Sequence, residues 1–251
     1  MSVAAGGHPE SLRALAFSDP ESDLWATAWI APNVPAALAT NQGITLSCAL
    51  EGERADEPWR LDTGDAELVL EGLPRSADEP IDSPPDFDQL CRVSGTLVIE
   101  SQPQDISCLG WRSARSPEVL ASDLDSLRQV AAWLGPEDGF ALLALRSARA
   151  KGQDADTVSA AMFEASDAKT IVDPRLSTTY AESGDPCRAG IELWLQAGDD
   201  PEQHYPRRAV GQATQPPSRW TVDSFTMEAL PFQWHVSGQE GPGIYLLGQR
   251  S

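Results

Sequence analysis

Basic residues are scarce in this chain of 251 residues. Its 18 Lys and Arg stand against 38 Asp and Glu, which gives a formal net charge of −20, and lysine occurs only at Lys151 and Lys169. Binding to a nucleic-acid backbone depends on clustered cations, and no basic cluster occurs in the sequence. We therefore expect no nucleic-acid partner, and we interpret the acidic residues as a solvated surface.

Long apolar runs are absent as well. No stretch of about 18 consecutive apolar residues occurs, and residues 1–22 lack the positively charged start and apolar core of a secretory signal. The sequence therefore predicts no membrane span. We expect a soluble, cytoplasmic protein.

Cysteine and histidine are few and scattered. The cysteines have neither a C-x-x-C spacing nor a histidine nearby at ligand spacing, so the usual zinc patterns are missing. Small buried thiols are the expectation, and two disulfides are the alternative. The histidines are too far apart in the sequence to indicate a metal site. These residues are Cys48, Cys91, Cys108 and Cys187, and His8, His204 and His235.

Familiar catalytic signatures are also missing. The sequence has no G-x-S-x-G nucleophile elbow, no Walker loop, no G-x-G-x-x-G after an apolar strand and no H-E-x-x-H. Nucleotide hydrolysis and serine-esterase chemistry are therefore disfavoured. We expect no cofactor.

What the sequence does contain is a series of short apolar runs separated by turn residues, with little helical spacing. Two short helices are expected, at 9–16 and 116–125. The proline-rich segment 73–90 is typical of a surface connection, and 135–139 of a hairpin loop. The expected strands are 24–31, 43–50, 66–73, 93–100, 105–111, 126–134, 140–149, 157–164, 169–172, 190–196, 207–213, 220–236 and 243–248.

This pattern predicts an all-β fold of the sandwich or barrel type. The strands divide near residues 111–126 into two β units, which predicts domains at 1–115 and 116–251. One continuous barrel or a single large β-sandwich is the alternative.

A carboxyl on an apolar face makes Glu228 the candidate acid. A period-two reading of 220–236 places Trp220, Leu230 and Trp234 on the same face as Glu228, although Pro231 interrupts the stretch. One interpretation is a carboxyl kept protonated by its apolar surroundings, which donates a proton to an alkene, carbonyl or epoxide. The other is an exposed side chain, or an ion pair with an arginine such as Arg207 or Arg208. Asp223 and Glu192 are the alternative acids.

Tryptophans fall in or beside most predicted strands. Large flat rings make walls for apolar ligands, although each ring also suits an ordinary core. In 190–196, Glu192 and Trp194 share a mixed face, opposite Ile191 and Leu193, and this mixed face is a candidate cavity lining. We select as candidate binding residues Trp133, Glu192, Trp194, Phe232, Trp234 and His235.

From residue 105 onward the chain resembles a known superfamily. The segments that carry the resemblance are Asp105–Ser113 (DISCLGWRS), Arg128–Gly135 (RQVAAWLG), Phe140–Leu145 (FALLAL), Gly190–Trp194 (GIELW), Phe232–His235 (FQWH) and Gly241–Leu247. In order and spacing they are similar to the hydroxyneurosporene synthase, or carotenoid 1,2-hydratase, superfamily.

The resemblance implies two tandem lipocalin-like antiparallel β-barrels, a cavity for an isoprenoid or another long apolar molecule, and acid-promoted addition or cyclisation in active members. It also implies that Trp111 and Arg112 line the cavity or the junction between domains. The family pattern continues with a histidine and a Trp-Gly pair, whereas Ser113 and Ala114 follow here. That departure favours a protein that binds without reacting.

Three hypotheses follow. The first is a protein that holds a hydrophobic small molecule, terpenoid or polyketide-like, and promotes its hydration or cyclisation as a lyase or isomerase, with Glu228 as proton donor. The second is a carrier or sensor that uses the same cavity. The third is a carbohydrate-active β-sandwich, which needs two carboxyls about 5 to 10 Å apart in an open groove.

Overall fold

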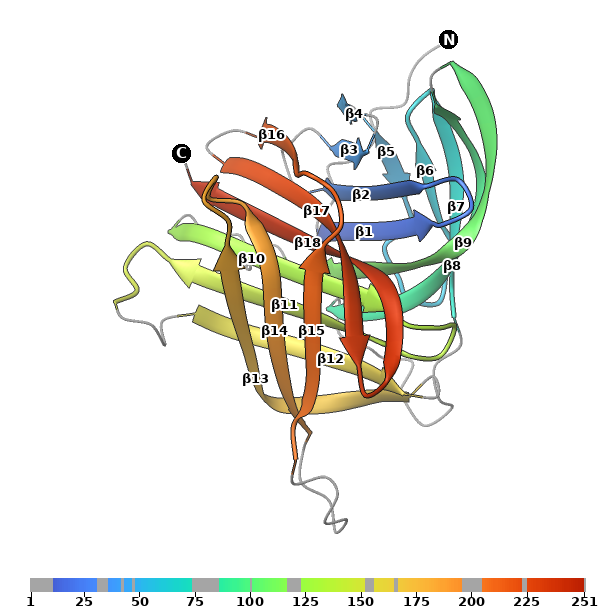
Figure 1. Cartoon of the computed structure of the whole chain (residues 1–251). Coiled ribbons are helices and arrows are strands. Elements are labelled where there is room, and N and C mark those ends of the chain that lie inside the picture. Colours follow the sequence, from blue (N-terminus) through green and yellow to red (C-terminus); the bar gives the residue numbers. More distant parts are fainter. Residues whose placement is uncertain are drawn as a thin grey trace.

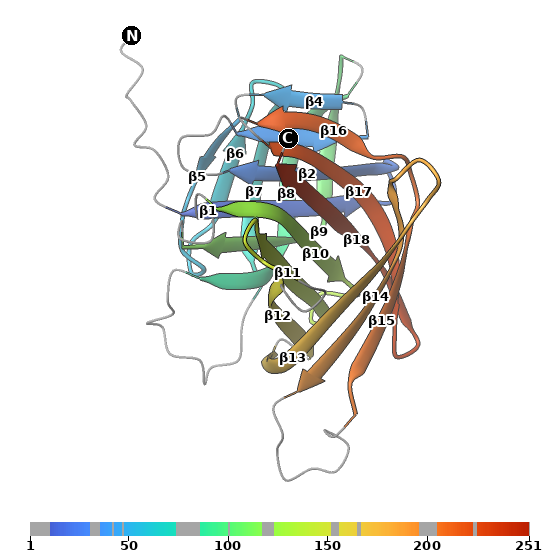
Figure 2. The ribbon, with the colours of Figure 1, turned by 90° about the vertical axis from the view of Figure 1, so that its left-hand side faces the viewer.

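A computed structural model describes residues 11–30, 36–41, 43–46, 48–73, 86–99, 101–116, 123–151, 156–164, 167–195, 205–222 and 225–250. Within these ranges the chain forms antiparallel strands and no helix, arranged in two nine-stranded sheets (Figure 1). The all-β prediction is confirmed, and each sheet curls into a barrel-like half (Figure 2).

The first sheet, which we call the N-terminal barrel, uses the chain up to Arg115. Its strands, in spatial order, are β4 (Gly43–Leu46), β3 (Ala37–Thr40), β2 (Leu24–Ile30), β1 (Leu12–Asp19), β9 (Gln102–Arg115), β8 (Phe87–Ile99), β7 (Ala66–Gly72), β6 (Trp59–Asp62) and β5 (Ala49–Glu51).

The second sheet, the C-terminal barrel, begins at Leu124. Its strands, in spatial order, are β15 (Arg207–Ala213), β14 (Pro186–Leu195), β13 (Asp167–Tyr180), β12 (Asp156–Glu164), β11 (Gly139–Ser147), β10 (Leu124–Trp133), β18 (Gln239–Arg250), β17 (Phe225–Val236) and β16 (Ser218–Val222). Because β15 also pairs with β17, eight of these strands close into a ring, and β16 lies outside it on β17.

Three expectations about local structure need correction. The predicted helix at 9–16 is wrong for residues 12–16, which belong to β1; this strand is buried on both faces, so its continuous apolar run lacks alternation. The stretch 220–236 forms two strands, β16 and β17, but Pro231, which was expected to interrupt it, lies within β17. The connection at 73–90 ends earlier than expected, since β8 starts at Phe87.

Several predicted elements are only partly described. Residues 74–85 of the connection and 117–122 of the second expected helix lie outside the described ranges. The predicted hairpin loop at 135–139 is confirmed, because Trp133 pairs with Gly139 and the Leu134 amide donates to the Asp138 carbonyl at 2.8 Å.

Apolar side chains gather in three clusters. One fills the interior of the N-terminal barrel and another the interior of the C-terminal barrel. The third draws residues from both sheets where β1 and β9 lie against β10 and β18, and we call it the seam. Two hydrogen bonds cross it, from Trp25 to the Gln215 side chain at 2.9 Å and from Ser218 to the Thr40 carbonyl at 3.0 Å.

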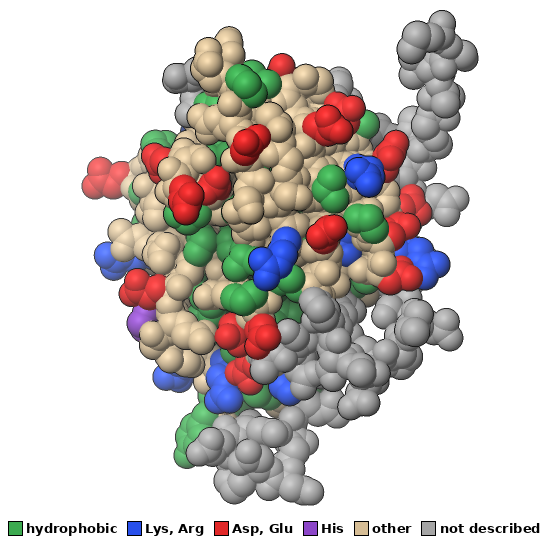
Figure 3. Space-filling model, turned by 90° about the vertical axis from the view of Figure 1, so that its right-hand side faces the viewer, with side chains coloured by type: hydrophobic (Ala, Val, Ile, Leu, Met, Phe, Trp, Pro, Cys, Tyr) green, Lys and Arg blue, Asp and Glu red, His purple; other side chains and the backbone are tan. Residues whose placement is uncertain are grey.

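The surface matches the composition. Acidic side chains are spread over the face shown in Figure 3, with fewer basic ones between them. In the described part of the chain, no helix has the length and apolar character needed to cross a membrane.

Candidate functional site

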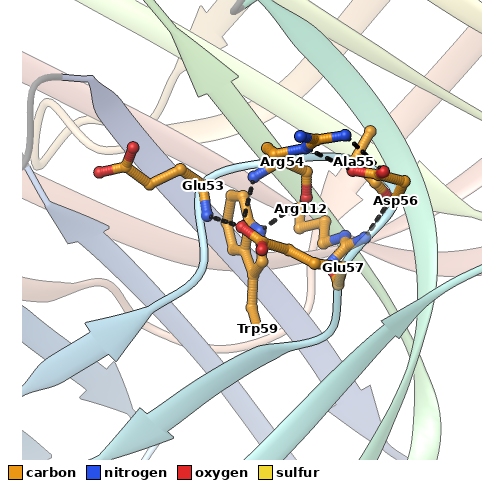
Figure 4. A network of polar contacts seen from close by, with 7 residues as sticks. All are labelled: Glu53, Arg54, Ala55, Asp56, Glu57, Trp59 and Arg112. Carbon is orange, nitrogen blue, oxygen red and sulfur yellow. Dashed lines mark hydrogen bonds and ion pairs between the residues drawn. The ribbon is translucent and has the colours of Figure 1, made fainter. Parts of the chain in front are cut away.

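Arg112 lies inside the N-terminal barrel and is completely buried. Its guanidinium donates to the Gln89 side chain at 2.8 and 3.0 Å, and it stacks 5.1 Å from the centre of the Trp59 ring. Three backbone carbonyls also accept from it, those of Ala55 at 2.6 Å, Glu57 at 2.7 Å and Leu70 at 3.1 Å. These contacts anchor Arg112 as part of the packing (Figure 4).

The carbonyls bound by Arg112 belong mainly to the loop between β5 and β6. That loop is ordered by Glu57, whose carboxylate accepts from the amides of Glu53 at 2.6 Å and Arg54 at 2.9 Å; these hydrogen bonds lower the pKa of Glu57. A second buried arginine, Arg13, donates to the carbonyls of Leu50 and Gly52 at the start of the loop. The loop is therefore held to β1 by Arg13 and to β9 by Arg112.

The seam holds two of the predicted residues, Trp111 and Trp133. The Trp111 indole donates to the Asp88 carboxylate at 3.2 Å, and Arg115 forms an ion pair with the same carboxylate. Among the described residues, five buried polar atoms of the seam have no hydrogen-bond partner. These are Nε1 of Trp29, Trp133 and Trp220, Oγ of Ser113 and Oε1 of Gln129. Because a buried polar atom without a hydrogen-bond partner costs free energy, these atoms favour the binding of a polar group at the seam.

Phe232 and Trp234 lie inside the C-terminal barrel, as the alternation of their strand predicts. Trp234 stacks on Phe232 at 5.5 Å between ring centres and meets Phe140 edge-on at 5.1 Å, while Phe232 stacks on Tyr245 at 5.3 Å. All four rings are at most 1% exposed. They form one continuous aromatic core.

Glu228 shares the inner face of β17 with Leu230, but it is not isolated. Its carboxylate accepts from Arg219 at 2.7 Å, and Arg219 also pairs with Asp185. The bond to Glu228 raises the pKa of Arg219. Of the interpretations of Glu228, the ion pair with an arginine is therefore the one observed, with Arg219 as the partner in place of Arg207 or Arg208.

The face predicted for 220–236 is not the same in β16 and β17. Trp220 pairs with Met227, and both belong to the seam, whereas Leu230 belongs to the barrel interior. Trp220 and Glu228 consequently lie on opposite sides of the sheet. Asp223, the alternative acid, lies outside the described residues.

Glu192, Trp194 and His235 point away from the interior of the C-terminal barrel. Their neighbours Ile191 and Leu193 occupy the inner face. Glu192 pairs with Arg208, whose side chain is 72% exposed, and the exposed His235 lies 3.4 Å from Glu240. These three residues therefore do not line the interior of the C-terminal barrel, because their apolar neighbours take the inward positions.

One part of the C-terminal interior remains open to solvent. Strands β12 and β13 pair only over Ala161–Glu164 and Asp167–Thr170, after which β13 bends away and continues beside β14 (Figure 1). Near this divergence the inward apolar side chains pack on the core but stay partly exposed. We call them the inner wall: Val158, Ala160, Ile171 and Leu176.

Polar side chains missed by the sequence reading lie beside the inner wall. Arg128 forms an ion pair with Asp156, which also accepts from Arg146 at 3.0 Å. The Tyr245 hydroxyl lies 2.7 Å from the Thr178 hydroxyl, and Arg128 faces the same interior from the neighbouring strand β10. Burial raises the pKa of Tyr245 to about 12, so the phenol keeps its proton at neutral pH.

The sequence contains a signal for two of these polar residues. Arg128 alternates with Val130 and Ala132, and Asp156 with Val158 and Ala160, so each is a charge at an inward position of an apolar strand. Within the described ranges, no group of three or more His, Cys, Asp or Glu side chains is arranged to hold a metal ion.

Comparison with known proteins finds the fold and no sequence relative. No family model and no curated protein matches the chain. The crystal structure of CghA with Sch210972 matches with a TM-score of 0.59 and 12% identity, over 97% of this chain and 89% of CghA. Kievitone hydratase from Nectria haematococca matches with a TM-score of 0.57 and 9% identity, over 96% and 89%. At such identities the likeness establishes a shared two-barrel architecture.

Proposed function

We propose that the C-terminal barrel binds a hydrophobic small molecule, of the isoprenoid, terpenoid or polyketide type, against the inner wall. The observation that carries this proposal is the partial exposure of Val158, Ala160, Ile171 and Leu176 on an inward face. An apolar ligand that covers this exposed area removes it from water, and the burial favours binding by roughly 25 cal/mol per Å² of apolar area.

The surroundings of the inner wall suit such a ligand. Behind it lies the aromatic core of Phe140, Phe232, Trp234 and Tyr245, which provides rigid apolar surface. Polar groups are few and gathered at one place, as in many small-molecule sites. The fold shared with CghA, crystallised with Sch210972, and with kievitone hydratase adds support for a small organic ligand.

A pair of neighbouring substitutions tests this location. Ala160 faces inward and Ser159 faces outward on the same strand, so Ala160→Trp fills the inner wall whereas Ser159→Trp leaves it free. We expect Ala160→Trp to reduce the amount of ligand co-purified from cells, or the binding of an isoprenoid probe, at least tenfold. Equal binding by the two folded variants contradicts the proposed location.

The seam is the second location to test, because of its unpartnered polar atoms. Gln129→Leu removes one of them, the amide oxygen, and keeps the size of the side chain. If Gln129→Leu abolishes binding and Ala160→Trp does not, the ligand lies between the barrels.

A catalytic role in hydration or cyclisation is the second candidate function, and the inward position of Glu228 favours it. The Glu228 carboxylate accepts from Arg219 at 2.7 Å, so proton donation to a ligand requires that contact to be lost when the ligand binds. Incubation of the protein with its recovered ligand, followed by mass analysis, separates enzyme from carrier. Glu228→Gln abolishes turnover and spares binding if Glu228 is the donor; retained turnover removes it from the mechanism.

A further inference from the structure

The polar group beside the inner wall is built across the barrel. In the closed ring, β13 and β18 are four strands apart in either direction, so Thr178 and Tyr245 come from opposite walls. Their 2.7 Å hydrogen bond therefore spans the interior. Only inward-facing side chains can make such a contact, so both hydroxyls point into the barrel interior, where Thr178 is partly exposed and Tyr245 is buried.

Arg128 joins this pair from the strand next to β18. It lies opposite Leu247, and its neighbour two residues along, Val130, lies opposite Tyr245, so Arg128 and Tyr245 are diagonal neighbours on the inner face. Arg128 is held on its other side by Asp156. The guanidinium is thus fixed in place next to the Tyr245 hydroxyl.

A count of donors shows what this arrangement leaves for a ligand. The two hydroxyls carry two hydrogens, and the bond between Thr178 and Tyr245 uses one of them. Arginine only donates, so the neighbouring Arg128 accepts neither hydroxyl hydrogen. One O–H therefore has no acceptor among the described residues, and Arg128 has further N–H groups beside it.

We infer that this trio, Arg128, Thr178 and Tyr245, receives a hydrogen-bond-accepting oxygen, a carbonyl or carboxylate, carried by the hydrophobic ligand. The inference rests on the proposed function and makes it narrower: the apolar body lies on the inner wall, and the oxygen faces the trio. Because the trio supplies donors, it discriminates against a hydrocarbon that lacks such an oxygen.

Three probes that share one sesquiterpene skeleton test separately whether an oxygen of the ligand faces the trio and whether its apolar body lies on the inner wall. Farnesoic acid carries a carboxylate, methyl farnesoate carries an ester carbonyl, and farnesene carries no oxygen. Tyr245→Phe and Thr178→Val each remove one hydroxyl with little change of shape, and Thr179→Val is the matched control on the exposed outer face. Affinities are measured by quenching of tryptophan fluorescence.

We expect Tyr245→Phe and Thr178→Val to weaken the binding of the two oxygen-bearing probes about tenfold. The affinity for farnesene should change less than about twofold. If the wild type binds the acid more tightly than the ester and Arg128→Met removes that difference, the oxygen belongs to a carboxylate. If Arg128→Met weakens the binding of both probes equally, the oxygen belongs to a carbonyl. Unchanged affinities in both hydroxyl variants, or equal losses for all three probes, overturn the inference and leave the proposed function standing. If the wild-type protein binds none of the probes, both are overturned.

Discussion

The two barrels use one architecture in different ways. In the N-terminal barrel, the inward side chains Trp59, Leu70 and Arg112 are fully buried, and the loop between β5 and β6 is held by Arg13 and Arg112. In the C-terminal barrel, the divergence of β12 from β13 leaves the inner wall partly exposed. The difference teaches that strand pairing and loop anchoring, more than residue hydrophobicity, decide which interior is filled and which keeps partly exposed apolar side chains.

Residue size adds to this contrast. The N-terminal interior is filled by Trp59 stacked under Arg112. In the C-terminal barrel, Trp234 lies flat against Gly211 and Gly243, where an added Cβ would come within 2.7 Å of the indole ring. The large ring is thus accommodated close to the backbone, and the space near Ala160 is not needed for it.

The largest effect on stability is expected from a substitution inside the N-terminal barrel. Arg112→Leu leaves the carbonyls of Ala55, Glu57 and Leu70 without their donor and removes the stack on Trp59. We expect the free energy of unfolding to fall by about 3 to 5 kcal/mol, because buried acceptors lose their partners. Denaturant unfolding measures this, with the exposed Arg92→Leu as a control that changes stability by less than about 0.5 kcal/mol. A small loss at Arg112 would show that the loop does not depend on it.

A smaller effect on the free energy of unfolding is expected at high pH, and it arises in the C-terminal barrel. The folded state raises the pKa of Tyr245 from 10.0 to about 12 through burial, so the native protein keeps a proton that the unfolded chain releases. Between pH 10 and 12 the free energy of unfolding therefore falls as pH rises. We expect this fall to be about 2 to 3 kcal/mol larger in the wild type than in Tyr245→Phe. Parallel pH profiles for the two proteins would contradict burial of the phenol.

The least disruptive test compares thiols in the two barrels. Cys48, Cys91 and Cys108 face the N-terminal interior, and burial raises their pKa to about 11, 12 and 12, respectively. At pH 8 we expect iodoacetamide to modify them roughly 100-fold more slowly than in the unfolded chain. Cys187, which is partly exposed on β14, reacts first. Peptide mapping identifies the order, and early labelling of Cys91 would show that the N-terminal barrel opens readily.

Much of the fold follows from local pattern. Period-two alternation located most strands, and the turn residues of 135–139 located a hairpin. The strand at Leu12–Asp19 escaped prediction because it is buried on both faces, so its apolar residues do not alternate. The pairing of β15 with β17, which closes the second ring, joins segments whose register no local pattern specifies.

The candidate site was less accessible to sequence reasoning. Phe232 and Trp234 were placed correctly in the interior, since alternation within one strand is a local property. Glu192 lies on the face opposite Ile191 and Leu193, as alternation predicts, but alternation does not say that this face lies outside the barrel beside Arg208. Tyr245 and Thr178 were missed because they meet only across a closed ring.

The sequence by itself determined an all-β chain with alternating strands, since side-chain period and turn chemistry act over a few residues. The tertiary structure alone decided that Arg112 anchors a loop, that Glu228 meets Arg219 and that Tyr245 reaches Thr178. Each of these contacts joins different strands, some of them far apart in the sequence. They depend on ring closure and register, and those are set by the packing of the whole sheet.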